Sequence, residues 1–191
     1  LHLSLRRQRQ MCIRDSVILI DQGTKTLALN TLRQDARIPL IGDWLGLQLA
    51  FNPGAIFSLG EGSTWVITVI GVAVTAVLIG AAIRARNVWS AVGFGFIVGG
   101  AIGNLIDRLF SPPAFGIGHV TDFLAYGNLF IGNLADVALG IGAVFLIVAG
   151  LRTSRRRPDP ASRPDPVDPV PAEETVHPLS PIHISEPTRP Y

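Results

Sequence analysis

The chain has 191 residues, of which 48% are hydrophobic and only 16% are charged, and its net charge is +2. A soluble domain usually carries about 25% charged residues, so this chain has too few charges to cover a water-facing surface. The small net charge gives no indication of a nucleic-acid partner. The single cysteine excludes an internal disulfide and a cysteine-based metal site, and the four histidines show no ligand spacing.

Both ends of the chain have the character of technical sequence. Residues 11–16 can be encoded by a DNA string whose reverse complement translates to a peptide close to residues 179–183. We therefore predict that residues 1–16 and 179–191 are translated sequencing adaptor, and set them aside. The alternative is a natural basic leader and a natural tail. Under the adaptor interpretation the first membrane span is truncated.

The first elements in chain order are a short apolar segment and a strand. Residues 17–20 are apolar and run into a polar stretch. Residues 45–51 alternate between large apolar residues and small or polar ones, the period-2 pattern of a strand. The turn that follows contains Asn52 and Gly54, which could bind a substrate backbone or simply make the turn. We predict a small sheet-like cap outside the hydrocarbon within residues 31–62.

Three long apolar runs follow the cap. Residues 64–83 and 88–106 contain no charge, and about 20 helical residues at 1.5 Å each cross a bilayer core of about 30 Å. The last run, residues 137–151, is about 22 Å long as a helix and must extend backward through Asp136 and Asn133 to cross. The sequence therefore predicts an all-α membrane protein with four transmembrane helices, the first of them truncated.

The basic residues give the orientation of these spans. Arginines lie between the second and third spans and directly after the fourth, and the positive-inside rule places both clusters in the cytoplasm. They are Arg84, Arg86, Arg152 and residues 155–157. The cap and residues 107–132 then face outward. Residues 152–178 are rich in Pro, Asp and Arg without apolar periodicity, and we predict a disordered cytoplasmic tail.

Three acids at membrane depth are the main functional candidates, because a charge there is costly. They are Asp107, Asp122 and Asp136. The third and fourth spans run antiparallel, so their outer ends bring all three acids to the same level. Two carboxylates a few ångströms apart cannot both ionise easily, and one keeps a proton while the other activates water. Asp136 has no cation within a helical turn in the sequence, which favours catalysis. The choice of Asp122 or Asp107 as its partner stays open, since Arg108 could pair with Asp107 structurally.

Other polar residues near the span ends have plainer interpretations. Asp21 and Lys25 are spaced i, i+4 on one helix face, which favours a structural ion pair. Asn104 and Asn133 carry amides that can donate to a carboxylate or to a peptide carbonyl. Capping of the last helix is the alternative role for Asn133.

Five sequence blocks, in this order, resemble the bacterial lipoprotein signal peptidase (signal peptidase II) family. They are DQGTK at 21–25, NPGAIFS at 52–58, GGAIGNLIDR at 99–108, VTDF at 120–123 and NLAD at 133–136. The resemblance covers about residues 17–151. It implies four transmembrane helices with an extracytoplasmic cradle of strands, in the bacterial cytoplasmic (inner) membrane, with the active site at the extracytoplasmic face. It also implies an aspartic endopeptidase that cuts a prolipoprotein just before its diacylglyceryl-modified cysteine.

The resemblance further implies roles for individual residues. The catalytic acids of the family are those of the VTDF and NLAD blocks, here Asp122 and Asp136, which leaves Asp107 as a supporting residue. The residues placed around the substrate and the two acids are Asn52, Gly54, Asn104, Arg108 and Asn133. Asp21 and Lys25 are mainly structural. The expected partners are the prolipoprotein and membrane lipids, and neither a metal nor a cofactor is expected.

Two departures and three rival classes accompany this resemblance. Gly132 precedes Asn133 where the family usually has Phe, and only 13 residues separate the two catalytic acids. Presenilin-like and prepilin peptidases carry a Gly-x-Gly-Asp block that this sequence lacks. A small proton or cation transporter is a non-enzymatic rival, but such proteins often show repeat symmetry, which is absent here. A third rival is a purely structural or assembly protein, for which Asp136 would be an unexplained cost.

Overall fold

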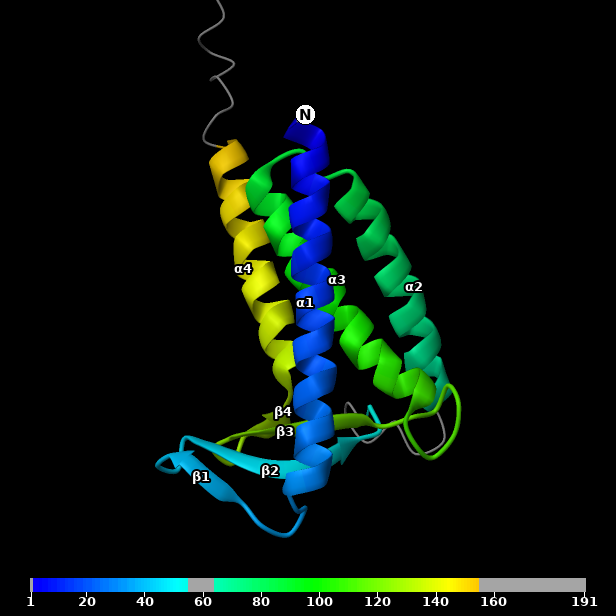
Figure 1. The fold of residues 1–191 in the computed structure, drawn as a ribbon, viewed down its shortest axis with the longest axis vertical. Helices are drawn as coiled ribbons and strands as arrows, with labels where there is room; N and C mark the ends of the chain where they lie inside the picture. The colour runs from blue at the N-terminus through cyan, green and yellow to red at the C-terminus, as the bar shows by residue number, and fades with distance from the viewer. Residues whose placement is uncertain (1, 55–63, 155–191) are drawn as a thin grey trace, which may run out of the picture. The chain divides into compact units, whose positions relative to one another are not determined.

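The computed structural model describes residues 2–54 and 64–154, with side chains from residue 7 onward. The described elements are helices that run side by side and a small sheet at one end of them (Figure 1). In chain order they are α1 (His2–Thr31), β1 (Ile38–Ile41), β2 (Leu45–Asn52), α2 (Thr64–Ile83), α3 (Val88–Phe110), β3 (Val120–Tyr126), β4 (Phe130–Gly132) and α4 (Leu134–Ser154).

Three of the described helices, α2, α3 and α4, are long and apolar enough to cross a membrane. The predicted second span matches α2 at both ends, and α3 continues four residues beyond the predicted third span, to Phe110. The last helix begins at Leu134, so its predicted backward extension through Asp136 is confirmed. Asn133 lies just before that helix, as its cap.

The first helix, α1, is continuous over 30 residues. The predicted end of the adaptor-derived segment at residue 16 does not interrupt the helix. The polar stretch after residue 20 is helical as well. Residues 2–22 contain neither Gly nor Pro, so nothing in them breaks a helix. This helix is not among those that length and composition qualify for crossing, so the prediction of four spans is met for three of the described helices.

A row of glycines on α3 receives α1 at close range. Gly95, Gly99 and Gly103 are spaced four residues apart and therefore share one helix face. A Cβ atom on Gly99 would lie 2.8 Å from Cβ of Val17, and one on Gly103 would lie 2.5 Å from Oδ2 of Asp21. Small residues allow two backbones in a membrane to approach in this way.

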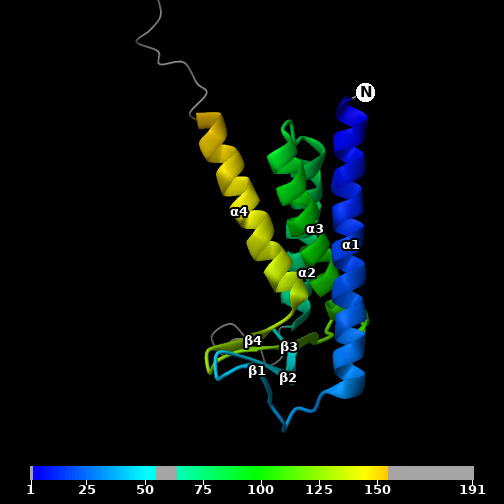
Figure 2. The same ribbon diagram turned by 60° about the vertical axis from the view of Figure 1, so that its left-hand side comes forward.

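The neighbouring face of α3 receives α4 by the same means. A Cβ atom on Gly100 would lie 2.6 Å from the carbonyl oxygen of Ala135, and Gly93 faces Gly142 across the same interface. Figure 2 shows that α1 and α4 approach each other at the sheet end. The polar residues of α1 and the first turn of α4 are therefore brought together beside the sheet.

The sheet has four antiparallel strands in the order β1-β2-β3-β4. The predicted strand at residues 45–51 is confirmed as β2, but the expectation that the cap came from residues 31–62 was too narrow. β3 and β4 lie in residues 120–132. The first four residues of β3, Val120 to Phe123, are all buried, so this strand has no apolar–polar alternation for sequence analysis to detect.

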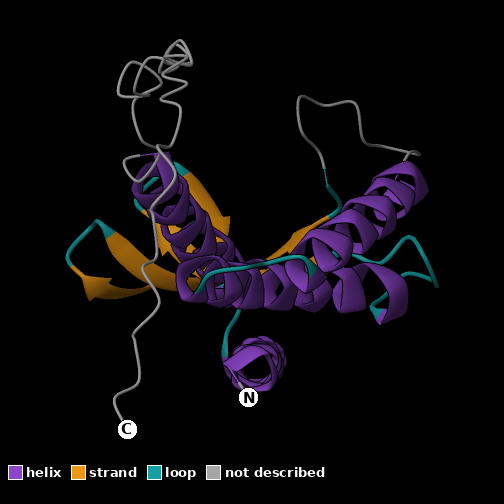
Figure 3. Ribbon diagram, turned by 90° about the horizontal axis from the view of Figure 1, so that it is seen from above, coloured by secondary structure: helices purple, strands orange, loops and turns teal. Residues whose placement is uncertain are grey.

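The sheet lies at the end of the helices where α3 ends and α4 begins, and Figure 3 gives the view along the helices. The connection between α2 and α3, with Arg84 and Arg86, lies at the opposite end, together with Arg152 near the end of α4. The basic residues predicted at positions 155–157, the tail to residue 178 and residues 179–191 lie outside the described residues.

Candidate active site

The first turn of α4 fixes Asp136 through a reciprocal cap. The backbone N–H of Asp136 donates to Oδ1 of Asn133 at 3.1 Å, and the backbone N–H of Asn133 donates to Oδ2 of Asp136 at 3.2 Å. This is the capping-box arrangement, with Asn as the cap and Asp three residues later. The carboxylate of Asp136 is therefore held at the N-terminus of α4, where the helix dipole favours negative charge.

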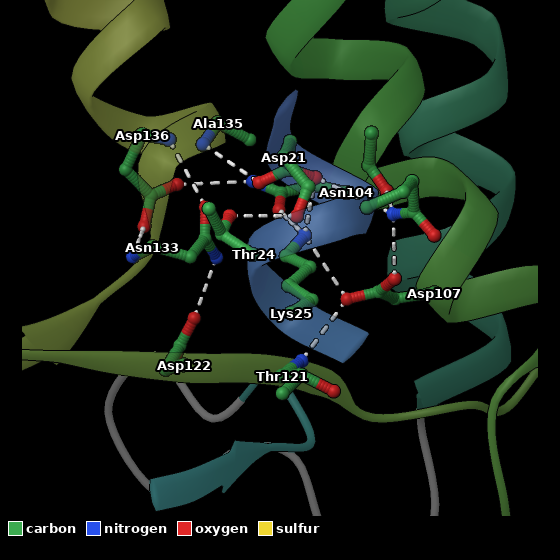
Figure 4. Close-up of polar contacts among 12 residues, drawn as sticks. Asp21, Thr24, Lys25, Asn104, Asp107, Thr121, Asp122, Asn133, Ala135 and Asp136 are labelled. Atoms are coloured by element: carbon green, nitrogen blue, oxygen red, sulfur yellow. Dashed lines mark hydrogen bonds and ion pairs between the residues drawn. The ribbon is translucent and has the colours of Figure 1, made fainter. Parts of the chain in front are cut away.

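The same asparagine also binds the second acid. Nδ2 of Asn133 donates to Oδ1 of Asp122 at 2.6 Å, and Asn133 is only 1% exposed. One buried residue thus contacts both carboxylates, although they come from different elements, β3 and α4 (Figure 4). The structure brings Asp122 and Asp136 to one point, as the sequence analysis expected from the antiparallel spans.

Asp122 is buried, and this changes its acidity. The residue is 3% exposed and pairs across the sheet with Ala50, near the end of β2. Burial raises the pKa of Asp122 to about 6, and the negative charge of Asp136 acts in the same direction. Hydrogen bonds from Asn133 and Asn52 oppose this rise. Asp122 can therefore carry a proton at a pH where an ordinary aspartate is ionised.

Asp136 has a more open setting. Its residue is exposed, and its Oδ1 accepts a hydrogen bond from Nδ2 of Asn104, on α3, at 2.9 Å. Together with the backbone N–H of Asn133, this gives the carboxylate two N–H donors. These two donors fix the position of the carboxylate at the start of α4. The open position leaves room for water or a substrate carbonyl to reach it.

Arg108 adds a positive charge beside the two acids and contacts the turn after β2. Its Nη1 donates to the carbonyl oxygen of Pro53 at 3.4 Å, and Asp122 and Asp136 interact electrostatically with its guanidinium. Gly54 has a φ of 92°, and a Cβ atom there would lie 2.9 Å from Nη1 of Arg108. Glycine is therefore required both for the turn conformation and for the contact. Oδ1 of Asn52 accepts from the N–H of Gly54 at 2.8 Å.

A buried ion network lies behind the two acids. The Nζ atom of Lys25 is 2.8 Å from Oδ2 of Asp21 and 3.0 Å from Oδ2 of Asp107. Lys25 also donates to Oδ1 of Asn104 at 3.0 Å. The ion-pair partner of Asp107 is therefore Lys25 of α1, whereas the sequence had suggested its neighbour Arg108. Figure 4 shows the network between α1 and α3.

Contacts that no sequence pattern predicts tie this network to the rest of the fold. Nε2 of Gln22 donates to Oδ1 of Asp107 at 3.0 Å, and the backbone N–H of Thr121 donates to Oδ2 of Asp107 at 3.0 Å. The backbone N–H of Ala135 donates to Oδ1 of Asp21 at 2.9 Å. Gln22 lies in the DQGTK block, but its partner is 85 residues further along the chain. Backbone donors leave no signal in the sequence at all.

Comparisons with known proteins place the chain in one family. The model of the signal peptidase (SPase) II family matches residues 15–152. The lipoprotein signal peptidase of Leifsonia xyli subsp. xyli is 44% identical over 137 residues, which are 71% of this chain and 63% of that protein. The lipoprotein signal peptidase of Rhodococcus jostii is 38% identical over 146 residues, which are 76% of this chain and 74% of that protein.

Solved structures give the same relationship at the level of the fold. A bacterial membrane enzyme superposes with a TM-score of 0.68 at 27% identity, over 80% of this chain and 93% of that one. A second bacterial membrane enzyme gives a TM-score of 0.66 at 26% identity. The chain is a bacterial membrane protein and belongs to the signal peptidase II family, the aspartic-type lipoprotein signal peptidases.

Proposed function

We propose that this chain is a membrane aspartic endopeptidase that removes signal peptides from diacylglyceryl-modified prolipoproteins by cutting just before the lipidated cysteine. The observation that carries the proposal is the buried Asn133, whose amide binds Asp122 while its backbone binds Asp136. Membership of the signal peptidase II family supports this activity. The match covers 63% of the length of the Leifsonia relative, so the activity of the whole chain is part of the proposal.

The proposed setting is the bacterial inner membrane, with the sheet and both acids on the extracytoplasmic side. The arginines at the opposite end of the helices support this orientation. We also propose that α1 crosses the membrane, as the first of four spans, and that the peptidase unit covers about residues 17–151. The close packing of Val17 on Gly99 and of Asp21 on Gly103 supports a place for α1 within the bundle.

The proposed mechanism gives the two catalytic acids different roles. Asp136, with two N–H donors and an open position, is the ionised general base that takes a proton from water. The resulting hydroxide attacks the peptide carbonyl carbon, while protonated Asp122 donates a hydrogen bond to the carbonyl oxygen. Collapse of the tetrahedral intermediate breaks the C–N bond, and the leaving amine takes up a proton from the pair of acids. The pKa of Asp122, raised to about 6 by burial, supports this order.

The residues around the two acids are proposed to bind the substrate. Arg108 and the turn with Asn52 and Gly54 lie beside Asp122, where they can receive the polar backbone around the scissile bond. The diacylglyceryl group of the substrate would remain among membrane lipids. Hydrocarbon anchoring would hold the bond at the depth of the two acids and supply part of the orientation that catalysis needs.

The test is cleavage of a diacylglyceryl-modified prolipoprotein by the purified, membrane-inserted protein in detergent and lipid. Asp122→Asn and Asp136→Asn should each lower kcat/KM by about 10²–10⁴-fold, the usual contribution of general acid–base catalysis. The matched control is Asp35→Asn, because Asp35 is exposed and pairs with Arg33 away from the site. Full activity in either site variant would contradict the assignment, and activity that disappears with a chelator would indicate a metal enzyme instead.

A further inference from the structure

The ammonium group of Lys25 has three acceptors, one for each of its N–H bonds. They are Oδ2 of Asp21 at 2.8 Å, Oδ2 of Asp107 at 3.0 Å and Oδ1 of Asn104 at 3.0 Å. An ammonium has three donors and no acceptor, so these contacts use its full capacity. Lys25 is 3% exposed, and water therefore has little access to compete for these bonds. The two carboxylates hold the charge in place, and the third bond goes to a neutral amide.

That third bond determines how the amide of Asn104 is turned. Lys25 can only donate, so the oxygen of the amide must face it, and the NH₂ group must point the other way. Nδ2 of Asn104 then donates to Oδ1 of Asp136 at 2.9 Å. Ionised Asp136 accepts only, so it requires the same orientation. Figure 4 shows Asn104 between the ion network and the first turn of α4.

We propose that Lys25 is a positioning residue for the reaction, which acts through Asn104 to hold Asp136 as the ionised member of the catalytic pair. A purely structural ion pair needs only Asp21 and Asp107 as partners. The additional hydrogen bond from Lys25 to Asn104 links the ion network to Asp136, the proposed general base. Hydrogen bonds in such a chain polarise one another, so an amide that accepts from an ammonium becomes a better donor. The inference rests on the proposed function.

Several other charges surround Asp136 and must be separated from this effect. Asp122 faces it from β3, and Arg108 from α3 interacts electrostatically with both acids. Asp107 on α3 and Asp21 on α1 lie one step further away, bound to Lys25. A variant that changes the net charge of the network would therefore shift the titration of the site directly. The design below keeps that net charge constant.

The measured quantity is the acidic limb of the pH profile of kcat/KM for a diacylglyceryl-modified prolipoprotein, because this limb follows the ionised base of the free enzyme. Asn104→Ala removes one hydrogen bond to that base and leaves the ion pairs of Lys25 intact. We expect it to move the limb to higher pH by about one unit. The double variant Lys25→Met/Asp107→Asn removes one charge of each sign, and we expect a shift in the same direction of about half a unit or more.

The decisive comparison is the triple variant Lys25→Met/Asp107→Asn/Asn104→Ala. Its limb should coincide with that of Asn104→Ala alone, because at constant net charge the proposed action of Lys25 on Asp136 runs through the hydrogen bonds of Asn104. Gln22→Met is the matched control. It removes hydrogen bonds to Asp107, Asp21 and the carbonyl oxygen of Gly103 and leaves those of Asn104 in place, so it should lower the melting temperature and leave the limb unchanged.

Three results would overturn the inference. An unchanged acidic limb in Asn104→Ala would show that the amide of Asn104 does not affect the ionisation of Asp136. This single variant tests the inference even if the others fail to fold. An unchanged limb in a folded Lys25→Met/Asp107→Asn would leave Lys25 a structural residue. Equal shifts with and without Asn104 would show that Lys25 acts directly through its charge. Each result leaves the proposed function standing, since that depends on cleavage by the parent and its loss in Asp136→Asn.

Discussion

Two neighbouring groups of acids in this molecule have different kinds of partners around their carboxylates. In the ion network, Asp21 and Asp107 share the ammonium of Lys25 and also accept backbone N–H groups. In the proposed catalytic pair, buried Asp122 has the neutral amide of Asn133 as a hydrogen-bond partner, and Asp136 is open. The first group is held by a shared cation and by backbone N–H groups, whereas Asp122 and Asp136 are held mainly by the amides of Asn133 and Asn104, with Arg108 nearby. Burial raises the pKa of Asp122 to about 6. The difference separates structural acids from candidate catalytic ones more clearly than their positions in the sequence do.

The largest expected effect comes from removing the shared cation. Lys25→Met leaves Asp21 and Asp107 buried without their ammonium, and breaking a buried pair in this way costs about 3–5 kcal/mol of folding free energy. Thermal unfolding of the detergent-solubilised protein measures the loss. Asp35→Asn, which removes one partner of an exposed pair, should cost at most about 1 kcal/mol. Similar melting temperatures for the two variants would mean that the network contributes little to stability.

The next effect distinguishes the ion network from the proposed catalytic pair by the sign of the change in folding stability. Asp107→Asn should destabilise the fold, whereas Asp122→Asn should stabilise it by about 1–3 kcal/mol at pH 7, because burying an ionised Asp122 is unfavourable. The pKa of Asp122 is raised to about 6 in the folded protein, above its ordinary value of 3.8. The folded state therefore binds the extra proton between these values, and its stability falls as the pH rises from about 4 to about 6.

This pH dependence makes the Asp122 prediction specific. The gain in folding stability of Asp122→Asn over the parent should be absent below pH 4. It should grow between pH 4 and pH 6 and stay constant above pH 6. Unfolding curves of both proteins at pH 4, 5, 6 and 7.5 would measure it. A constant difference across this range would show that the substitution acts through packing and not through ionisation. Destabilisation by Asp122→Asn at pH 7 would place Asp122 with the structural acids.

A last effect, of similar size, concerns how closely α1 and α3 approach. Gly103→Ala introduces a Cβ atom 2.5 Å from Oδ2 of Asp21, so the ion network must shift, at a cost of about 1–3 kcal/mol. Gly140→Ala is the matched control, because a Cβ atom on Gly140 meets nothing within 4 Å in the described structure. Thermal unfolding of both variants checks the prediction. Equal melting temperatures would mean that α1 can move away from α3 without loss.

Much of this architecture follows from composition and periodicity. The charge-free runs that became α2 and α3 are long enough to cross a bilayer, and the period-2 alternation of residues 45–51 in the sequence predicted β2. Asp136 could be singled out from the sequence, since an acid at the start of an apolar helix is costly wherever that helix packs. The motif blocks then predicted the family that the comparisons show.

Other features were decided only by the tertiary structure. β3 is buried along most of its length, so it lacks the alternation that would have predicted it, and the cap was expected to be smaller than it is. The cation that pairs with Asp107 is Lys25, 82 residues earlier in the chain, and not the adjacent Arg108. Side-chain spacing along one helix is local information, whereas a contact between α1 and α3 depends on how glycines let two helices approach. For that reason the motif blocks alone could imply a role for each acid, but only packing could show which groups hold it, Lys25 for Asp21 and Asp107 and Asn133 for Asp122 and Asp136.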